Sequence, residues 1–460
     1  MKLIFWGAAR QVTGSMHLIE LHDGYRILLD CGLDYEQKRN FHYSPQVSFP
    51  FEPTSIGCVI LSHAHIDHSG NIPNLVRQGF RGQILCTPPT LQLSRQLLLD
   101  SAKIQSYEYK KGKKGKVKSP KPLYTTSNVN ESVEQFVTLD FHKPFRLHEH
   151  VEMEFCGAGH LLGAAAVLLK IEDKGKLKTL YFTGDRGRNN SPLTPDAEPI
   201  QKCDALISES TYGNRNHRKG IDPAEELMQF VESCCVQKNG RLIIPAFSVG
   251  RTQAILFCLK KLHEQGKLPP IKVFVDSPLA IKGIDIYEKN IHLLNDEARE
   301  FLKSHGDLFH WENLQLVEDA EHSKELDSYF DPCIIVSAAG MVEGGRIQQH
   351  VANNISNPYS TILIAGYCAE GTLGHRLLQG MQTIRIKNRE LPVYATVAST
   401  DAFSSHADGE QLTYDILQAN ASKTFLVHGE GLNMETLQQK LEEGGLPEVW
   451  LPEAGDEFIL

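Results

Sequence analysis

The sequence predicts an α/β protein in which a second α/β domain interrupts a discontinuous first domain. At 460 residues the chain exceeds a typical domain of ~100–200 residues, which favours two domains. Beyond Asp204, apolar strand-like runs alternate with stretches long enough for helices, as expected around a largely parallel sheet. These runs lie at 205–207, 242–246, 271–275, 333–337 and 361–364. Because ligand-type histidines occur on both sides of this region, residues 1–207 and 396–460 are expected to form the first domain and residues 208–395 the insert.

A short loop after a predicted buried strand carries four side chains of the metal-ligand type. The apolar run Val59 to Leu61 predicts the strand, and Pro73 suits the first turn of a following helix. Between them lie His63, His65, Asp67 and His68. A tetrahedral ion has its ligands about 109° apart, so one ion cannot easily take all four from so short a loop. Two ions fit better, with the first two histidines turned to one and the last two ligands to the other.

The composition limits the possible partners and the compartment. The net charge of −9 argues against a surface that attracts nucleic acid broadly, so a polyanionic substrate needs a local basic groove or metal ions. The ten cysteines show no Cys-x-x-Cys spacing and lie mostly in apolar runs, which is typical of reduced core residues in a cytosolic protein. No run approaches the ~18 apolar residues of a membrane span.

Three short strands are predicted at the start of the chain, at Leu3–Trp6, His17–Leu21 and Tyr25–Leu29. Glycine-containing turns separate them, so they are expected to form a meander of hairpins. Asp30 ends the third strand, and its position is typical of an aspartate that caps a turn.

Residues 103 to 121 carry eight lysines, interspersed with glycine and proline. Such runs are usually solvated and mobile. The alternative is an arm that follows the phosphates of a nucleic acid, which is attractive because the rest of the protein is acidic.

Further ligand-type residues follow at the ends of predicted strands and in small-residue turns. His160 lies in a glycine-containing turn before the apolar run Ala164 to Leu169. Asp185 ends a predicted strand, and its two carboxylate oxygens allow it to bridge two cations, which an imidazole cannot do. His406 and His428 appear only after the predicted insert. The two-ion arrangement is one ligand short without a further histidine, and His428 completes it.

These motifs resemble those of a known family. The pattern His-x-His-x-Asp-His after a strand resembles the signature of the metallo-β-lactamase fold. The interruption of that fold before its last histidine resembles the β-CASP family, which processes RNA or DNA. Ser208 to Gly213 is similar to motif A of that family through Glu209, Ser405 to Asp408 to motif B through His406, and Val427 to Gly429 to motif C through His428. Gly7 to Ser15 also resembles the opening of the β-CASP nucleases.

The resemblance implies a discontinuous metallo-β-lactamase αββα sandwich with an inserted Rossmann-like β-CASP α/β domain that acts as a lid. It implies two zinc ions, with Asp185 bridging them and Asp30 hydrogen-bonded to the ligand loop. The expected ligands are His63, His65 and His160 for one ion and Asp67, His68 and His428 for the other. Hydroxide between the ions is the expected nucleophile, because zinc lowers the pKa of bound water from 15.7 to about 7. The expected catalytic residues are His406 as general acid, Glu209 as the residue that orients it, and Asp67.

The expected activity is zinc-dependent hydrolysis of RNA in RNA processing or decay, by a cytoplasmic homodimer. A histidine at motif C favours RNA over DNA, again by resemblance. A DNA nuclease, another hydrolase of the same fold, and a non-catalytic RNA-processing subunit are the alternatives.

Three glycine-containing segments of the insert also carry a cation, and these are expected to bind substrate phosphates. Their candidate residues are Ser248, Arg251, Arg346 and Arg376. His217, His310 and His350 lack such a setting and are interpreted as surface or core histidines.

Overall fold

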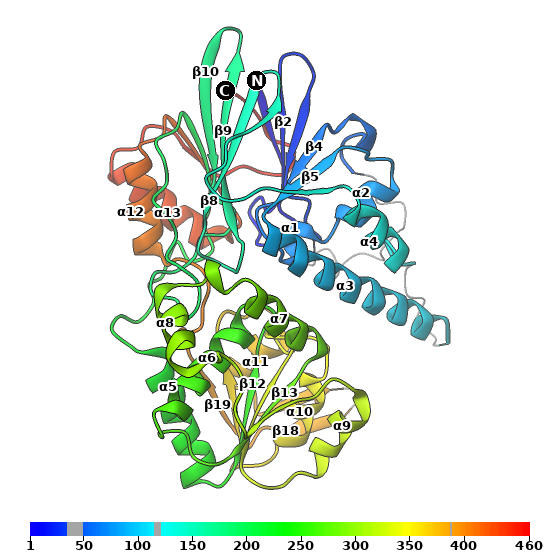
Figure 1. Ribbon diagram of the computed structural model, residues 1–460, viewed down its shortest axis with the longest axis vertical. Helices are drawn as coiled ribbons and strands as arrows, with labels where there is room; N and C mark the ends of the chain where they lie inside the picture. The colour runs from blue at the N-terminus through cyan, green and yellow to red at the C-terminus, as the bar shows by residue number, and fades with distance from the viewer. Residues whose placement is uncertain (35–48, 115–120, 387–388) are drawn as a thin grey trace. The chain divides into compact units, whose positions relative to one another are not determined.

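The computed structural model describes residues 1–34, 49–114, 121–386 and 389–460, and it divides them into two compact units (Figure 1). The first unit contains residues 1–189, 196–216 and 406–460, and the second contains residues 190–195 and 217–405. Among the described residues no helix is both long and apolar enough to span a membrane.

The first unit is built on two seven-stranded sheets. The strand order of the first sheet is β22-β1-β2-β3-β4-β5-β6, and that of the second is β21-β20-β11-β10-β9-β8-β7. The first sheet consists of β1 (Lys2–Gly7), β2 (Met16–Glu20), β3 (Arg26–Leu29), β4 (Cys58–Ile60), β5 (Gln83–Cys86), β6 (Phe136–Thr138) and β22 (Glu457–Ile459). The second consists of β7 (Phe145–His148), β8 (Val151–Gly157), β9 (Ala165–Asp173), β10 (Lys176–Phe182), β11 (Ala205–Glu209), β20 (Lys423–Val427) and β21 (Val449–Trp450). The predicted N-terminal meander is confirmed, since β1, β2 and β3 pair in antiparallel order.

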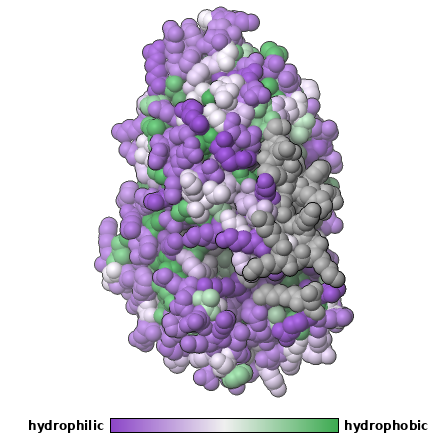
Figure 2. Space-filling model, turned by 90° about the vertical axis from the view of Figure 1, so that its right-hand side faces the viewer, coloured by the Kyte–Doolittle hydropathy of each residue, from purple (hydrophilic) through white to green (hydrophobic). Residues whose placement is uncertain are grey.

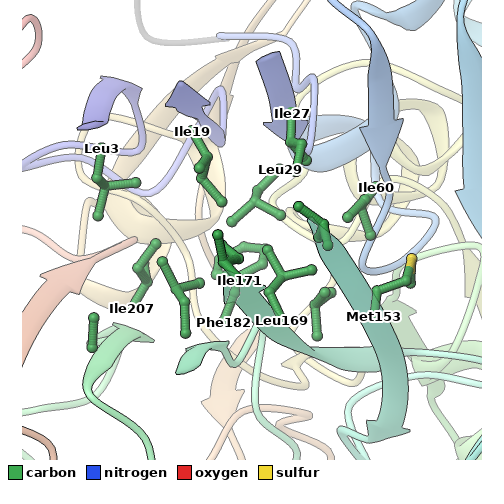
Figure 3. Close-up of a cluster of buried hydrophobic side chains, with 14 of the residues drawn as sticks. Leu3, Ile19, Ile27, Leu29, Ile60, Met153, Leu169, Ile171, Phe182 and Ile207 are labelled. Carbon is green, nitrogen blue, oxygen red and sulfur yellow. The ribbon is translucent and has the colours of Figure 1, made fainter. Parts of the chain in front are cut away.

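The two sheets of this unit pack face to face over a shared apolar core. Figure 3 shows Leu3, Ile19 and Ile60 of the first sheet opposite Leu169 and Phe182 of the second, all of them buried. The outer face of the first sheet is covered by α1 (Ile66–Ser69), α2 (Ile72–Arg77), α3 (Pro88–Lys114) and α4 (Thr126–Val133). The outer face of the second is covered by α12 (Gly409–Ala419) and α13 (Gly431–Glu443). This arrangement is the predicted αββα sandwich.

The second unit has a six-stranded sheet whose strands are all parallel, in the order β14-β13-β15-β12-β16-β19. Its strands are β12 (Arg241–Pro245), β13 (Lys272–Asp276), β14 (Leu314–Leu316), β15 (Cys333–Ser337), β16 (Thr361–Ile364) and β19 (Thr396–Ser399), and β17 (Thr383–Ile386) forms a separate hairpin with β18 (Arg389–Pro392). The helices of this unit are α5 (Pro223–Val231), the π-helix η3 (Glu232–Gln237), α6 (Arg251–Glu264), α7 (Pro278–Lys289), α8 (Asp296–His305), α9 (Ala320–Glu325), α10 (Ile347–Asn354) and α11 (Leu373–Leu378). The predicted βα repetition is therefore found.

The junctions between the units differ from the sequence-based boundaries. Strand β11 extends to Glu209 and pairs with β20 as far as Val427, so residues 208–216 lie in the first unit. Strand β19, which the boundary at residue 396 assigned to the first domain, pairs with β16 in the second unit. The run 205–207, which the predicted boundaries assigned to the first domain, lies in the first unit.

His17 is a polar residue inside the apolar core of the first unit. Its ring is completely buried between the rings of Phe5 and Phe182, with centroids 5.2 and 5.6 Å away, and neither ring nitrogen has a hydrogen-bond partner among the described residues. Burial, together with the nearby imidazoles of His68 and His428, lowers the pKa of His17 from 6.5 to about 3.

Replacement of His17 by leucine is expected to make the protein less sensitive to acid. Because the folded pKa is depressed, only the unfolded chain takes up a proton on this ring, so stability falls as the pH drops from about 6.5 toward 3, by up to ~1.4 kcal/mol per pH unit. His17→Leu removes this loss and also the cost of burying two unpaired nitrogens. Urea unfolding at pH 7 and pH 5 measures the effect, and a variant that is less stable than the parent at pH 5 would contradict it.

Candidate metal centre

The predicted ligand loop lies where the sequence placed it, between a buried strand and a helix. Strand β4 ends at Ile60, the loop runs through His63 and His65, and α1 begins at Ile66. Asp67 and His68 lie on α1 itself, and Pro73 is in the first turn of α2, as predicted. The short helix turns the second pair of ligands away from the first pair, which is what two neighbouring ions require.

The other candidate ligands come from loops at one edge of the second sheet. Strand β10 is parallel to β11, and β11 is parallel to β20, so the carboxyl ends of these three strands lie at the same edge. Asp185 follows β10, Glu209 ends β11, and His428 follows β20. His160 lies in the turn between β8 and β9. Residues far apart in the sequence therefore converge beside the ligand loop because of the strand order.

Four side chains form the first ligand set, and their atoms lie close together. The Nδ1 atom of His65 is 3.1 Å from Nε2 of His63 and 3.2 Å from Nε2 of His160. The Oδ2 atom of Asp185 is 3.5 and 3.6 Å from those two Nε2 atoms. Ligands at 2.0–2.1 Å from a tetrahedral zinc ion are separated by about 3.3 Å, so these spacings fit one ion.

The second ligand set contains Asp67, His68 and His428. Nε2 of His428 is 3.5 Å from Oδ2 of Asp67, and Nε2 of His68 is 3.2 Å from Oδ1 of Asp185. Both atoms of the latter pair are buried, yet neither has a hydrogen-bond partner among the described residues. Buried polar atoms without partners are costly, and a cation between them would remove that cost. The two oxygens of Asp185 thus face different ligand sets, as a bridging carboxylate requires.

The charge states of the first ligand set and of Asp67 suit cations. For His68, burial acts to lower the pKa, but the carboxylates of Asp185 and Asp30 raise it well above its usual value, so a cation would displace a proton from this ring. Burial lowers the pKa of His63 and His160 well below the usual value and that of His65 to about 4, so these imidazoles are neutral and keep a lone pair. Burial acts to raise the pKa of Asp67, but the hydrogen bond with His428 and the charge of His68 lower it to about 2. Neutral imidazoles and ionised carboxylates are the forms that bind metals.

Asp30 lies behind the ligand loop and is fully buried. Its Oδ1 accepts a hydrogen bond from the backbone N–H of Ser62 at 2.8 Å, and its Oδ2 accepts from Ser62 Oγ at 2.9 Å and lies 2.7 Å from Nδ1 of His68. Because a carboxylate accepts, Nδ1 of His68 carries the proton and Nε2 is left for a metal. Ser62 Oγ is also 3.1 Å from Nδ1 of His63. Because the hydroxyl proton of Ser62 is donated to Asp30, Nδ1 of His63 carries the proton of this contact, and Nε2 keeps the lone pair. Asp30 is therefore hydrogen-bonded to the ligand loop. Its role in orienting the imidazoles stays a prediction.

His406 and Glu209 form a pair beside the ligand sets. Nδ1 of His406 lies 3.0 and 3.2 Å from the two carboxylate oxygens of Glu209, and Nε2 is 4.0 Å from Oδ2 of Asp185. The backbone N–H of Arg186 donates to the same carboxylate. Burial acts to lower the pKa of His406, but the charge and hydrogen bond of Glu209 raise it overall. The pairing holds Nε2 toward the ligand sets, where a proton donor would be needed.

The predicted phosphate-binding residues lie in the second unit. Arg251 begins α6 and is buried, with its guanidinium 4.6 Å from the ring centroid of Phe247. Ser248 Oγ is 3.4 Å from the hydroxyl of Ser277. Arg346 donates to Asp276 at 2.6 Å and to two backbone carbonyls. These contacts stabilise the unit itself.

The remaining candidates of the second unit differ in exposure. Arg376 is exposed on α11. His350 is a buried histidine whose Nε2 lies 2.6 Å from Asp276, and His310 is half-exposed beside Asp307, so both fit the interpretation as core or surface residues. Phosphate binding by this unit stays a prediction.

Comparisons with protein families cover most of the chain. The Beta-lactamase superfamily domain matches residues 25–239, the Beta-Casp domain residues 252–377, and the Zn-dependent metallo-hydrolase RNA specificity domain residues 390–452.

Individual relatives agree with these matches. Ribonuclease TTHA0252 of Thermus thermophilus is 32% identical over 94% of this chain and 93% of its own length. The RNase J-like protein of Methanocaldococcus jannaschii is 30% identical over 93% of this chain and 92% of its own length. The Drosophila melanogaster cleavage and polyadenylation specificity factor 73 is 30% identical over 95% of this chain but 61% of its own length. A solved structure of a protein of unknown function from Enterococcus faecalis matches with a TM-score of 0.54 over 100% of this chain and 99% of that chain, at 14% identity, which concerns the fold alone.

The fold and the ligand sets define a metal-dependent hydrolase of the metallo-β-lactamase superfamily. The second unit, with its Beta-Casp match, narrows the class further. The chain belongs to the β-CASP family of nucleases.

Proposed function

We propose that the protein is a ribonuclease that uses two zinc ions. The observation that carries the proposal is the position of Asp185, whose Oδ2 faces one ligand set and whose Oδ1 faces the other. The first ion would be held by His63, His65 and His160, and the second by Asp67, His68 and His428. When bound, such a pair of ions lowers the pKa of water and neutralises charge on a phosphodiester.

The protein's own residues would supply orientation and a proton. His406 donates a proton from Nε2 to the leaving ribose oxygen, while Glu209 accepts a hydrogen bond from Nδ1 and keeps the ring in place. Asp67, on α1, would hold the second ion together with His428, whose Nε2 lies 3.5 Å from its Oδ2 atom. Burial of Asp185 and Glu209 keeps water from competing for these contacts.

RNA is the proposed substrate because relatives that match nearly the whole chain are named ribonucleases.

The basic half of α3 supports a nucleic-acid ligand. None of residues 103–112 of this helix is buried, and Tyr107 is 66% exposed. Lys103, Tyr107 and Lys110 are spaced i, i+4 and i+7, so they share one face of the helix. The coloured part of the face drawn in Figure 2 is largely hydrophilic. Residues 115–120 of the predicted arm lie outside the described part.

Substitutions on this face are expected to separate charge from stacking. Lys103, Lys110 and Lys111 changed together to glutamine should weaken RNA binding and reduce the dependence of log K on log salt by about 2, at ~0.7 for each phosphate contact. Tyr107→Ala should weaken binding roughly tenfold without changing that slope, because stacking on a base involves no counterions. Fluorescence anisotropy with labelled RNA at several salt concentrations measures both.

Matched controls are available in the same unit. Tyr414 is 63% exposed on α12, so Tyr414→Ala tests whether the loss of any exposed tyrosine weakens RNA binding. Lys143, Lys174 and Lys176 are exposed away from α3, and their change to glutamine tests total charge. If the α3 lysine variant binds RNA at low salt as tightly as the parent does, α3 takes no part in binding.

The activity is tested with RNAs labelled separately at the 5′ and 3′ ends, with and without a chelator. Chelator-sensitive cleavage of RNA, with matched DNA left intact, is expected. Products of one discrete length from either label identify internal cleavage, and nucleotides released from one label identify cleavage from an end. Turnover of nitrocefin without RNA cleavage would instead indicate another hydrolase. Tight RNA binding by a metal-free, inactive protein would indicate a non-catalytic subunit.

We further propose a cytoplasmic homodimer. All ten cysteines are free and buried, which is consistent with a reducing compartment. Light scattering of the purified protein tests the oligomeric state, and a mass of about 51.5 kDa would contradict the dimer.

A further inference from the structure

Thr211, two residues beyond Glu209, contacts His428 in two ways. Its Oγ1 atom is 3.0 Å from Nδ1 of the imidazole and donates a hydrogen bond to the backbone carbonyl of the same residue at 3.1 Å. Thr211 is buried, as is His428. We propose that Thr211 is a positioning residue that holds His428 as the tautomer with its proton on Nδ1. This inference rests on the proposed metal centre, because it concerns the nitrogen that a metal would use.

The tautomer follows from counting protons. A hydroxyl has one proton, and the carbonyl oxygen of His428 can only accept, so the proton of Thr211 is used there. The contact with Nδ1 then requires the imidazole to donate, which places its proton on Nδ1. The lone pair is left on Nε2, the atom that lies 3.5 Å from Oδ2 of Asp67 in the second ligand set, whereas the protonated Nδ1 lies 3.6 Å from Oδ1 of Asp185. With the opposite tautomer Nε2 would carry a proton and could not bind a metal.

The carbonyl contact matters because the backbone of His428 is unusual. Its φ of 49° lies in the left-handed region, which non-glycine residues seldom adopt. The backbone N–H of His428 donates to Ala8 at 2.7 Å, and its carbonyl accepts from Thr211 and, at 3.4 Å, from the N–H of Ser210. The hydroxyl of Ser210 donates to the carbonyl of Val427. The segment after β11 therefore fixes both the backbone and the ring of His428.

Thr211 is itself held in place. The side chain of Asn433, on α13, donates to the Thr211 carbonyl at 2.8 Å. Two residues earlier, Glu209 holds the ring of His406. One short segment thus positions a proposed proton donor through Glu209 and a proposed metal ligand through Thr211. Loss of the Thr211 hydroxyl should affect the second ligand set alone, because the first set has no contact with it among the described residues.

The test compares Thr211→Val and Thr211→Ala, which remove the hydroxyl, with Thr211→Ser, which keeps it. Thr424→Val is the matched control, since Thr424 is a buried threonine on neighbouring strand β20 whose hydroxyl has no partner among the described residues. Zinc content is measured by elemental analysis, and affinity by competition with a chromophoric chelator. One of two zinc ions should bind 10- to 100-fold more weakly in the valine and alanine variants, as for other residues that orient metal ligands. The serine variant and the control should bind both ions as the parent does.

The outcomes separate this inference from the proposed function. A parent protein that binds two zinc ions, with Thr211→Val or Thr211→Ala unchanged in affinity for both, overturns the role of Thr211 alone. Equal weakening of both ions, or failure of Thr211→Ser to restore affinity, also overturns it, because either result indicates a general structural effect. A parent that binds fewer than two equivalents overturns the paired-zinc proposal. Urea unfolding of each variant without metal identifies any loss of folding.

Discussion

Asp185→Asn is expected to remove both bound metal and nuclease activity. The side chain is 2% exposed, and each of its oxygens faces a different ligand set. Replacing one oxygen by an NH₂ group places a donor where a ligand is needed and removes the negative charge, which the surrounding imidazoles stabilise by holding the pKa of Asp185 well below its usual value despite burial. We expect less than one zinc equivalent by elemental analysis and no measurable RNA cleavage.

The matched control is Asp204→Asn, at the opposite end of the same strands. Asp204 accepts hydrogen bonds from the backbone and hydroxyl of Thr179 through one oxygen, which asparagine retains. This variant should keep full metal content. An Asp185→Asn protein that still holds two zinc ions would show that the carboxylate does not bridge them.

His406→Ala is expected to lower turnover of RNA by roughly 10²–10⁴ while leaving zinc content unchanged. Nε2 of the ring lies 4.0 Å from Asp185, and its other nitrogen is taken by Glu209, so we expect it to give a proton rather than to hold a metal. Glu209→Gln should lower turnover less, because the amide oxygen can still accept a hydrogen bond from Nδ1.

The leaving group distinguishes a proton donor from a structural residue. A p-nitrophenyl phosphodiester releases an anion that needs no proton, so its hydrolysis should be nearly equal in the parent and His406→Ala proteins. An equal loss on both substrates, or a loss of zinc in the variant, would exclude His406 as the general acid.

The local pattern of the sequence predicted the ligand loop and the parallel sheet of the second unit. Four ligand-type residues within six positions must lie close together, because the strand before them and the helix after them fix the loop. The strands of the second unit could likewise be predicted, because each is a short apolar run. The roles of His160, His406 and Glu209 needed resemblance, because a single histidine or glutamate in a loop has no local signature.

The features that could not be predicted from the sequence depend on contacts between segments that are distant in the chain. Strand β11 belongs to the first unit because it pairs with β20, more than 200 residues later, and nothing in residues 205–209 indicates that partner. The sequence likewise did not indicate that the guanidinium of Arg346, a predicted phosphate-binding residue, donates to Asp276 at the end of β13. Ser62 lies next to the predicted ligand loop, and Thr211 lies in the motif Ser208 to Gly213. The role of a hydroxyl can be inferred only when the imidazole that it contacts is known.

The dispersal of the ligand sets has a consequence during synthesis. His68 and His428 are 428 − 68 = 360 positions apart, and β20, which carries the second of them into place, must pair with β11 before the ligand sets are complete. At about 5–20 residues per second a ribosome needs roughly 20–70 s to add those residues. On the proposed ligand sets, the nascent chain has no complete centre throughout that interval, so the messenger and ribosomal RNA beside it meet the nuclease only after the first unit has folded.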